Sequence, residues 1–356
     1  MTPVFSADAL PVLVGSMPHA DHRQAVDLIF AATPQIPIWP QLPKYPIEGM
    51  LRQFLPGMPG VTERDGKIFV DGQTPDFADQ FLSFFEDYLL VEEGGIDLDS
   101  SRFAMSPEEA GGFFVFLEEA ARRRQQLTAL KGQITGPITF CTGLVDQDGR
   151  AVFYNDQLRD AAVKLLALKA RWQTRMMARV KERPLIFFDE PGLAGFGSSA
   201  FITISPADIA TCFAEVFAGV HQEGGLAGVH VCANTEWSVI FDTEVDIVNF
   251  DAYAYFDKLI LYPRHLRSFF ARGGILASGI VPTSAQQIAA ETAPSLVDKW
   301  FDQARQLVQL GIDERTVFSQ TLITPSCGTG AISEELAETV LRLTGEVSAL
   351  IREKLR

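Results

Sequence analysis

Short apolar runs rich in β-branched and aromatic residues alternate along the chain with longer amphipathic stretches. The short runs lead into Gly, Pro, Asp or Cys, which is typical of buried strands in a parallel sheet. The pattern predicts eight strands, over Val12–Gly15, Ile36–Trp39, Leu130–Thr135, Leu185–Asp189, Gly228–Cys232, Ile247–Phe250, Ile275–Ser278 and Val317–Leu322.

The longer stretches carry apolar residues at helical spacing. Two of them begin with Pro107 and Pro206, each directly after a serine, and Ser followed by Pro is a common helix start. The predicted helices are Asp21–Ala32, Asp76–Glu92, Pro107–Gln126, Gln157–Val180, Pro206–Gln222, Leu259–Ala271, Pro294–Leu310 and Glu334–Lys354.

The alternation of strands and helices predicts an α/β fold with a parallel sheet and crossover helices. Eight such units fit a single (β/α)₈ barrel that takes in residues 1–356 as one domain. An open nucleotide-binding sheet is disfavoured, because no G-x-G-x-x-G follows the first strand and there is no P-loop motif. The stretch Gly57–Thr74 interrupts the alternation and predicts a β-hairpin after the second strand, with Asp65 and Gly66 at its turn. We expect this hairpin to cover one mouth of the barrel.

The amino-acid composition argues against some classes of binding partner and some locations in the cell. The chain has 45 acidic and 30 basic residues, a net charge of −15, which argues against binding to nucleic acid or to an anionic membrane. No apolar stretch is long enough for a membrane span, and the N-terminus lacks the basic region of a signal peptide. Four scattered cysteines do not suit a disulfide framework. We therefore expect a cytoplasmic protein with reduced thiols.

Several polar residues follow the predicted strands, where barrel enzymes gather their chemistry. His230 and Cys232 are two residues apart in one strand, so both side chains point to the same side, and Cys327 follows the last strand. Two thiolates and an imidazole suit Zn²⁺ better than Mg²⁺ or Ca²⁺. The alternative is that both cysteines are small buried hydrophobes and His230 is a core histidine.

Asp189 and Glu190 end the fourth strand, before a proline. Their side chains should point to opposite sides, one toward the barrel axis and the other toward the surrounding helices. We predict a catalytic role, in binding a substrate ammonium group or in proton transfer. A helix cap or a salt bridge is the alternative for this pair.

Five segments together resemble one known superfamily, which unites uroporphyrinogen decarboxylase, cobalamin-independent methionine synthase and corrinoid-dependent thiol methyltransferases. VGSMPHA is similar to the I-G-S-F-P-Q-T opening of the methionine synthase catalytic barrel, and FFDEPGL to its D-E-P-A-L. HVCANTEW is similar to its H-M-C segment and to the H-x-C-G-N-T of the corrinoid-to-thiol enzymes. DIVNFD is placed like the segment with its carboxylate ligand, and TPSCGTG like its N-P-D-C-G-L.

The resemblance implies a barrel that binds catalytic zinc through His230, Cys232 and Cys327 and activates a thiol, usually homocysteine. The fourth family ligand, a Glu in the methionine synthases, corresponds to Asp251, which binds directly, through water or not at all. Residues implied or predicted to bind substrate are Gly15, Ser16, Asp189 and Asn234.

The methyl donor is a separate question. The loop SGIVPTS lacks the His with which methionine synthase helps to protonate its folate leaving group, and a methylated corrinoid needs no such acid. We therefore expect a methyl-corrinoid donor, on its own or on a corrinoid protein. The alternatives are transfer to another thiol such as coenzyme M, a non-catalytic zinc- or thiol-binding barrel, and a hydrolase of another barrel family. Decarboxylase activity is disfavoured, because that branch binds its substrate through N-terminal arginines and only Arg23 precedes Arg52 here.

Overall fold

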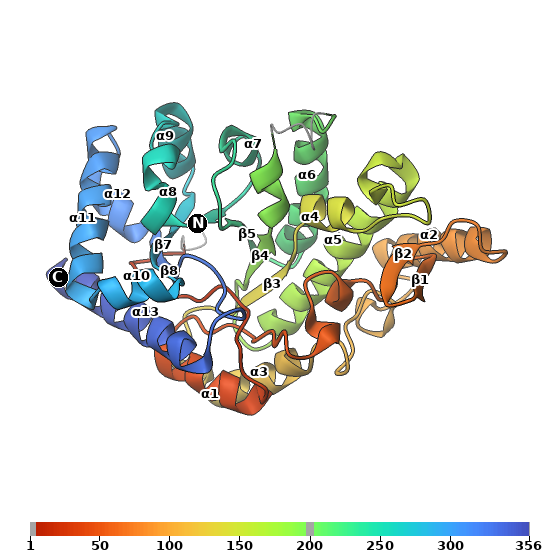
Figure 1. The fold of residues 1–356 in the computed structure, drawn as a ribbon, viewed down its shortest axis with the longest axis horizontal. Helices are drawn as coiled ribbons and strands as arrows, with labels where there is room; N and C mark the ends of the chain where they lie inside the picture. The colour runs from red at the N-terminus through yellow and green to blue at the C-terminus, as the bar shows by residue number, and fades with distance from the viewer. Residues whose placement is uncertain (1–4, 197–202, 356) are drawn as a thin grey trace.

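The computed structural model describes residues 5–196 and 203–355 (Figure 1). Six strands form one parallel sheet, and their order in space is their order along the chain. They are β3 (Lys131–Thr135), β4 (Leu185–Asp189), β5 (Leu226–Val231), β6 (Ile247–Phe250), β7 (Ile275–Val281) and β8 (Thr321–Pro325). Helices lie between successive strands in the chain, so the predicted α/β class with a parallel sheet is confirmed.

The first two predicted strands are extended segments that do not form continuous hydrogen-bonded ladders with neighbouring strands. Single parallel bridges join Pro11 to β8, Ser16 to Gln41, and Ile38 to β3. The two segments therefore connect β8 back to β3 in the places where the sequence predicts strands. Proline explains why no ladder forms, since Pro11, Pro37 and Pro40 have no amide hydrogen to donate.

Alternate residues of the strands point toward one interior. One cluster of buried apolar side chains includes Leu185 and Phe187 of β4, Ile247 of β6, Ala277 of β7 and Leu322 of β8. Side chains of the two extended segments belong to the same cluster: Val12, Ile36 and Ile38. Because side chains alternate along a strand, the next inward residues toward the carboxyl ends lie on top of this apolar cluster.

Thirteen α-helices lie in the described residues. Their bounds are α1 (His22–Ala32), α2 (Phe77–Glu92), α3 (Gly111–Arg122), α4 (Pro137–Gly143), α5 (Asp156–Ala178), α6 (Pro206–Gln222), α7 (Ser238–Phe241), α8 (Ala252–Leu259), α9 (Pro263–Ala271), α10 (Ala285–Ala290), α11 (Ala293–Gln309), α12 (Glu314–Ser319) and α13 (Glu334–Lys354). None of these helices is long and apolar enough to cross a membrane.

Three predicted elements differ clearly from the observed ones. Helix α3 does not begin at Pro107, because Ser106 and Glu109 close a separate turn through their side chains, each accepting from the other's backbone N–H. The predicted helix Leu259–Ala271 is two helices, α8 and α9, with Pro263 starting the second. Val317 lies in α12, and β8 begins only at Thr321.

The predicted hairpin is confirmed as β1 (Val61–Arg64) paired with β2 (Lys67–Val70). Asp65 and Gly66 at its turn have φ of 52° and 72°, which is the left-handed conformation that a tight hairpin turn needs. Figure 1 shows both strands at the outer edge of the molecule, beside α2. No hairpin residue lines the cavity described below, so the prediction that it covers the mouth is wrong.

Candidate active site

Four polar side chains lie in one row across neighbouring strands. The ladder register pairs Thr135 of β3 with Asp189 of β4, Asp189 with His230 of β5, and His230 with Asn249 of β6. This row lies near the carboxyl ends of the strands, one step beyond the apolar interior. The sheet therefore brings together residues that are far apart in the sequence, as expected for a barrel-type site.

The structure gathers three of the predicted metal ligands. One ligand atom each from His230, Cys232 and Cys327 lies within 4.8 Å of the others. Zinc bonds of about 2.0–2.3 Å in a tetrahedron place ligand atoms roughly 3.3–3.8 Å apart, so small shifts would fit them to an ion. His230 Nε2 is buried without a hydrogen-bond partner in the described structure, which also suits a metal ligand.

The other ring nitrogen of His230 is occupied. Nδ1 lies 2.6 Å from Oδ1 of Asn249, a fully buried residue. Our sequence prediction missed Asn249. The available signal was a lone amide in the apolar strand I-V-N-F, which has to find partners when it is buried.

The two cysteines differ in acidity. A hydrogen bond from the Cys327 thiol is the main cause that lowers the pKa of the Cys232 thiol, and the neighbouring His230 lowers this pKa further. The pKa of Cys327 is raised, because its thiol donates to the Cys232 sulfur and is largely buried. The pair therefore favours a thiolate at Cys232, the form in which cysteine binds metals.

Asp251 does not join this group. Its Oδ1 accepts a hydrogen bond of 2.9 Å from Ala254 N, so that the side chain caps the N-terminus of α8. Burial raises the pKa of Asp251 to about 6. The group of adjacent ligand atoms consists of the other three residues, and the predicted fourth protein ligand is absent from it.

A cavity of about 320 Å³ opens beside the three ligands. Its lining comprises Val14, Ser16, Gln41, Pro43, Glu48, Gly49, Met50, Thr135, Asp189, Pro191, His230, Cys232, Cys327 and Gly328. Asp189 is the notable polar group, because its Oδ1 is buried and has no partner in the described structure. Burial raises the pKa of Asp189, while His230 and Lys131 act in the opposite direction. An unpartnered carboxylate oxygen of this kind is suited to receive an ammonium group from a ligand.

Lys131 lies buried below the polar row. Its Nζ donates to the backbone oxygen of Val14 and lies 4.5 Å from the ring centre of Phe187. Burial lowers the pKa of Lys131 to about 8, although Asp189 raises it. Lys131 is absent from the cavity lining, so we treat it as part of the supporting structure.

The predicted substrate residues divide into two groups. Ser16 and Asp189 line the cavity, whereas Gly15 and Asn234 do not. Gly15 is packed against Gln133, where an added Cβ would lie 3.0 Å from a side-chain carbon. Asn234 is exposed to solvent, outside the cavity.

Glu190, which we predicted to be catalytic, points away from the cavity and binds the start of α4. It is fully buried, and its carboxylate accepts hydrogen bonds from Ile138 N (2.8 Å), Thr139 N (2.7 Å) and Thr139 Oγ1 (2.6 Å) at the start of α4. Burial raises its pKa to about 7, although these hydrogen bonds lower it. The strand alternation explains the difference, since Asp189 faces the cavity and Glu190 faces the helices.

A second buried carboxylate, Glu48, was also missed. It lines the cavity, and its two oxygens lie 2.6 Å from His22 Nε2 and from Leu42 N. Glu48 ends a short 3-10 helix, Pro46–Glu48, which no predicted strand or motif includes, so only the folded structure shows its place.

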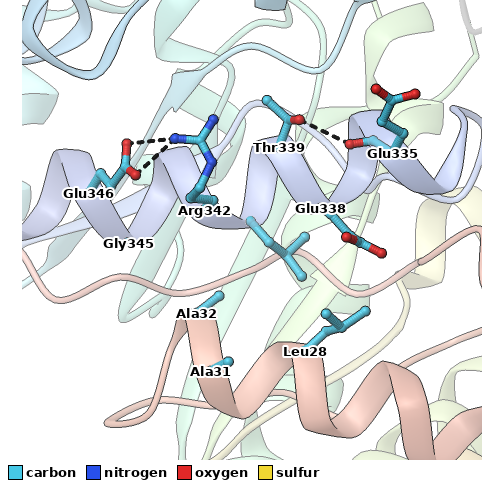
Figure 2. A pocket seen from close by; sticks show the side chains of 10 residues that line it. Leu28, Ala31, Ala32, Glu335, Glu338, Thr339, Arg342, Gly345 and Glu346 are labelled. Carbon is cyan, nitrogen blue, oxygen red and sulfur yellow. Dashed lines mark hydrogen bonds and ion pairs between the residues drawn. The ribbon is translucent and has the colours of Figure 1, made fainter.

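A larger hollow of about 580 Å³ lies between α1 and α13 (Figure 2). Its lining mixes apolar residues of α1 with Glu338 and other polar residues of α13. Arg342 there is already paired with Glu346 at 2.8 Å, and the described residues that line the hollow include no His or Cys. The smaller cavity, which contains the possible metal ligands and Asp189, is therefore the candidate active site.

Comparisons with known proteins give structural neighbours only, since no family profile and no curated sequence matches the chain. A B12-independent methionine synthase from Shewanella sp. W3-18-1 is 19% identical, with a TM-score of 0.47 over 67% of each chain. A methyltransferase from Methanosarcina mazei is 14% identical, with a TM-score of 0.49 over 99% of each chain. The GH20 modules of a pneumococcal exo-β-D-N-acetylglucosaminidase are 10% identical, with a TM-score of 0.43 over 96% of this chain and 85% of that one. Because these likenesses are weak, a function for this chain has to be argued from its own site.

Proposed function

We propose that this chain is a zinc-dependent methyltransferase that transfers a methyl group to the thiol of an aminothiol, with homocysteine as the best candidate. The observation that carries the proposal is the group His230, Cys232 and Cys327 at the wall of a cavity that also holds an unpartnered carboxylate. Two sulfur ligands and an imidazole nitrogen are a donor set typical of zinc. Three protein ligands leave one position for a substrate, as catalytic zinc sites do.

Each residue then has a defined task. Zinc held by the three ligands would lower the pKa of a substrate thiol, about 8.5 when free, so that a nucleophilic sulfur is available at neutral pH. Asn249 orients His230, and Asp189 would bind the ammonium group of the substrate. These contacts would fix the sulfur in position for in-line attack on the methyl carbon.

The lining favours an aminothiol over an anionic thiol. It contains the carboxylates of Asp189 and Glu48, and no Lys or Arg belongs to it in the described part of the chain. A sulfonate-bearing thiol such as coenzyme M would meet these carboxylates and would find no Lys or Arg in the described lining to pair with its sulfonate. Homocysteine has an ammonium group for Asp189, and its carboxylate could bind N–H or O–H donors near Ser16.

For the donor we propose a methyl-corrinoid. In this reaction the sulfur–carbon bond forms and the cobalt–carbon bond breaks, with the bonding electron pair left on cobalt, so no acid is required. Residues Ser278–Ser284 supply no His, Asp or Glu beside the site, and Thr283 is bonded to Ser326 Oγ at 3.1 Å. A cavity of about 320 Å³ suits a small thiol, so a macrocycle would have to approach from the mouth, where Met50 is exposed.

The test is methyl transfer by the purified chain. Methylcobalamin and methyltetrahydrofolate are each offered with homocysteine or coenzyme M, and the methylated thiol is quantified by mass spectrometry. We expect methionine from methylcobalamin and homocysteine, and loss of the reaction in Cys232→Ala. Zinc and thiol binding without turnover by any donor would instead indicate a non-catalytic binding protein. Faster methionine formation from methyltetrahydrofolate would overturn the donor assignment.

A further inference from the structure

Asn249 lies at the centre of a buried hydrogen-bond network that spans four strands. Besides the contact with His230, its Nδ2 donates to Ala277 O at 2.8 Å and to Thr324 Oγ1 at 2.9 Å. Thr324 Oγ1 donates in turn to Pro325 O at 2.9 Å. The register explains the arrangement, because His230, Asn249 and Ala277 are direct partners on β5, β6 and β7.

The partners of Asn249 determine which way its amide points. Ala277 O can only accept, and the Thr324 hydroxyl already uses its hydrogen on Pro325 O, so both face the amide NH₂. The amide oxygen must therefore face His230 Nδ1. Since that oxygen can only accept, the hydrogen of a neutral imidazole has to be on Nδ1. This leaves a free lone pair on Nε2, which has no hydrogen-bond partner in the part of the chain that the structure describes.

We propose that Asn249, held by Thr324, is a positioning residue that fixes His230 in the Nδ1–H tautomer and so presents Nε2 to the metal. The inference rests on the proposed zinc site. The same network also fixes the backbone at Pro325, two residues before the ligand Cys327. One buried polar cluster would thus hold two ligand-bearing strands in register with each other.

The free-energy cost of burying the polar groups around Asn249 indicates that this cluster has a function. Burying an amide in an apolar strand is unfavourable unless each of its polar atoms is paired, and here all of them are. Loss of an outer partner of a metal-binding histidine typically reduces metal affinity about 10- to 100-fold. We expect that range for Asn249→Ala and a smaller loss for Thr324→Val, which leaves the bond between Asn249 and His230 in place.

The first experiment reads the tautomer without metal, thiol or donor. The metal-free chain is labelled with ¹⁵N-histidine, and long-range ¹H–¹⁵N spectra are recorded at pH 9, with His230→Gln used for assignment among the five histidines. We expect Nδ1 protonated and Nε2 bare in the parent protein. A bare Nδ1 with a proton on Nε2 would overturn the inference, whatever the fate of the proposed reaction.

The second experiment measures zinc affinity by chelator competition in Asn249→Ala, Thr324→Val and the control Thr243→Val. Thr243 is a matched buried threonine, whose hydroxyl donates to Ile240 O at 2.6 Å, away from His230. We expect affinity to fall in the first two variants and to stay at the parent value in the control. If Asn249→Ala fails to fold, the zinc affinity of Thr324→Val and the His230 tautomer of the parent protein decide whether Asn249 has the positioning role. Unchanged affinity in Thr324→Val and in any folded Asn249→Ala would refute the positioning role.

Discussion

Replacing Asp189 with Asn tests how the site would select its thiol. The substitution keeps the shape of the side chain and removes its charge. In the structure the Asp189 carboxylate lines the cavity, and its buried Oδ1 has no hydrogen-bond partner among the described residues. A charge-assisted hydrogen bond to a substrate ammonium is worth roughly 1.5–3 kcal/mol. At about 1.4 kcal/mol per tenfold, homocysteine should bind about 10- to 150-fold more weakly to Asp189→Asn.

The assay is calorimetric titration of zinc-loaded protein with homocysteine and with 4-mercaptobutyrate, which lacks the amino group. Two ligands and two proteins form a thermodynamic cycle that isolates the contact between the carboxylate and the ammonium group. We expect the substitution to weaken homocysteine binding and to leave 4-mercaptobutyrate binding nearly unchanged. Zinc content should match the parent protein, because Asp189 is not among the three ligands.

Asp251→Asn is the matched control. It removes the same charge from the end of β6, outside the cavity lining, and Asn can still cap α8. Homocysteine affinity should stay near the parent value in this control. Equal homocysteine affinity in Asp189→Asn and the parent would refute the reasoning. An equal loss for both thiols would show that Asp189 shapes the cavity and does not recognise the amine.

Three further predictions concern the metal, the thiol and pH. Protein purified in reductant without chelator should carry close to one zinc per chain by elemental analysis, lost in Cys232→Ala and Cys327→Ala but kept in Cys212→Ala, a buried cysteine of α6; metal-free parent protein would contradict this. X-ray absorption should show one additional sulfur ligand when homocysteine is added, and identical spectra with and without the thiol would exclude substrate coordination. Burial raises the pKa of Glu190 from 4.5 to about 7, so its folded state binds the proton more tightly and its stabilising effect is lost as pH rises from about 4.5 to 7. This difference corresponds to about 3 kcal/mol. Denaturant titrations should show Glu190→Gln losing stability less steeply over this range than the parent, and parallel profiles would show that Glu190 does not titrate there.

Local sequence signals predicted most of the fold. The bounds of α6 and α13 agree with their predicted ranges, because Ser205 and Ser333 cap them as local chemistry requires. The hairpin turn at Asp65 and Gly66 is equally local. The first two predicted strands are extended segments with only isolated bridges to their neighbours. Whether such a segment forms a continuous ladder depends on how many backbone amides are free to pair between its prolines. The pattern of apolar residues does not reveal this number.

The candidate site was predictable only in part. Strand ends and motifs identified His230, Cys232, Cys327 and Asp189, because these residues lie at or just beyond the carboxyl ends of apolar strands. Strand alternation also indicated that Asp189 and its neighbour face opposite sides. Asn249 could not be assigned from sequence, because its role depends on partners contributed by three other strands.

The electrostatics of the cavity bear on the choice of donor. At physiological ionic strength charges are screened beyond about 8 Å, so the net charge of −15 matters less than the groups that line the cavity. The lining includes the buried carboxylates of Glu48 and Asp189, and it holds no lysine or arginine among the residues that the structure describes. A folate donor carries glutamate carboxylates and would have to bring them close to like charges. The amide side chains of a corrinoid are neutral and bring no carboxylates to the site, and a corrinoid also needs no proton to leave. Charge and leaving-group chemistry therefore favour the same donor, on independent grounds.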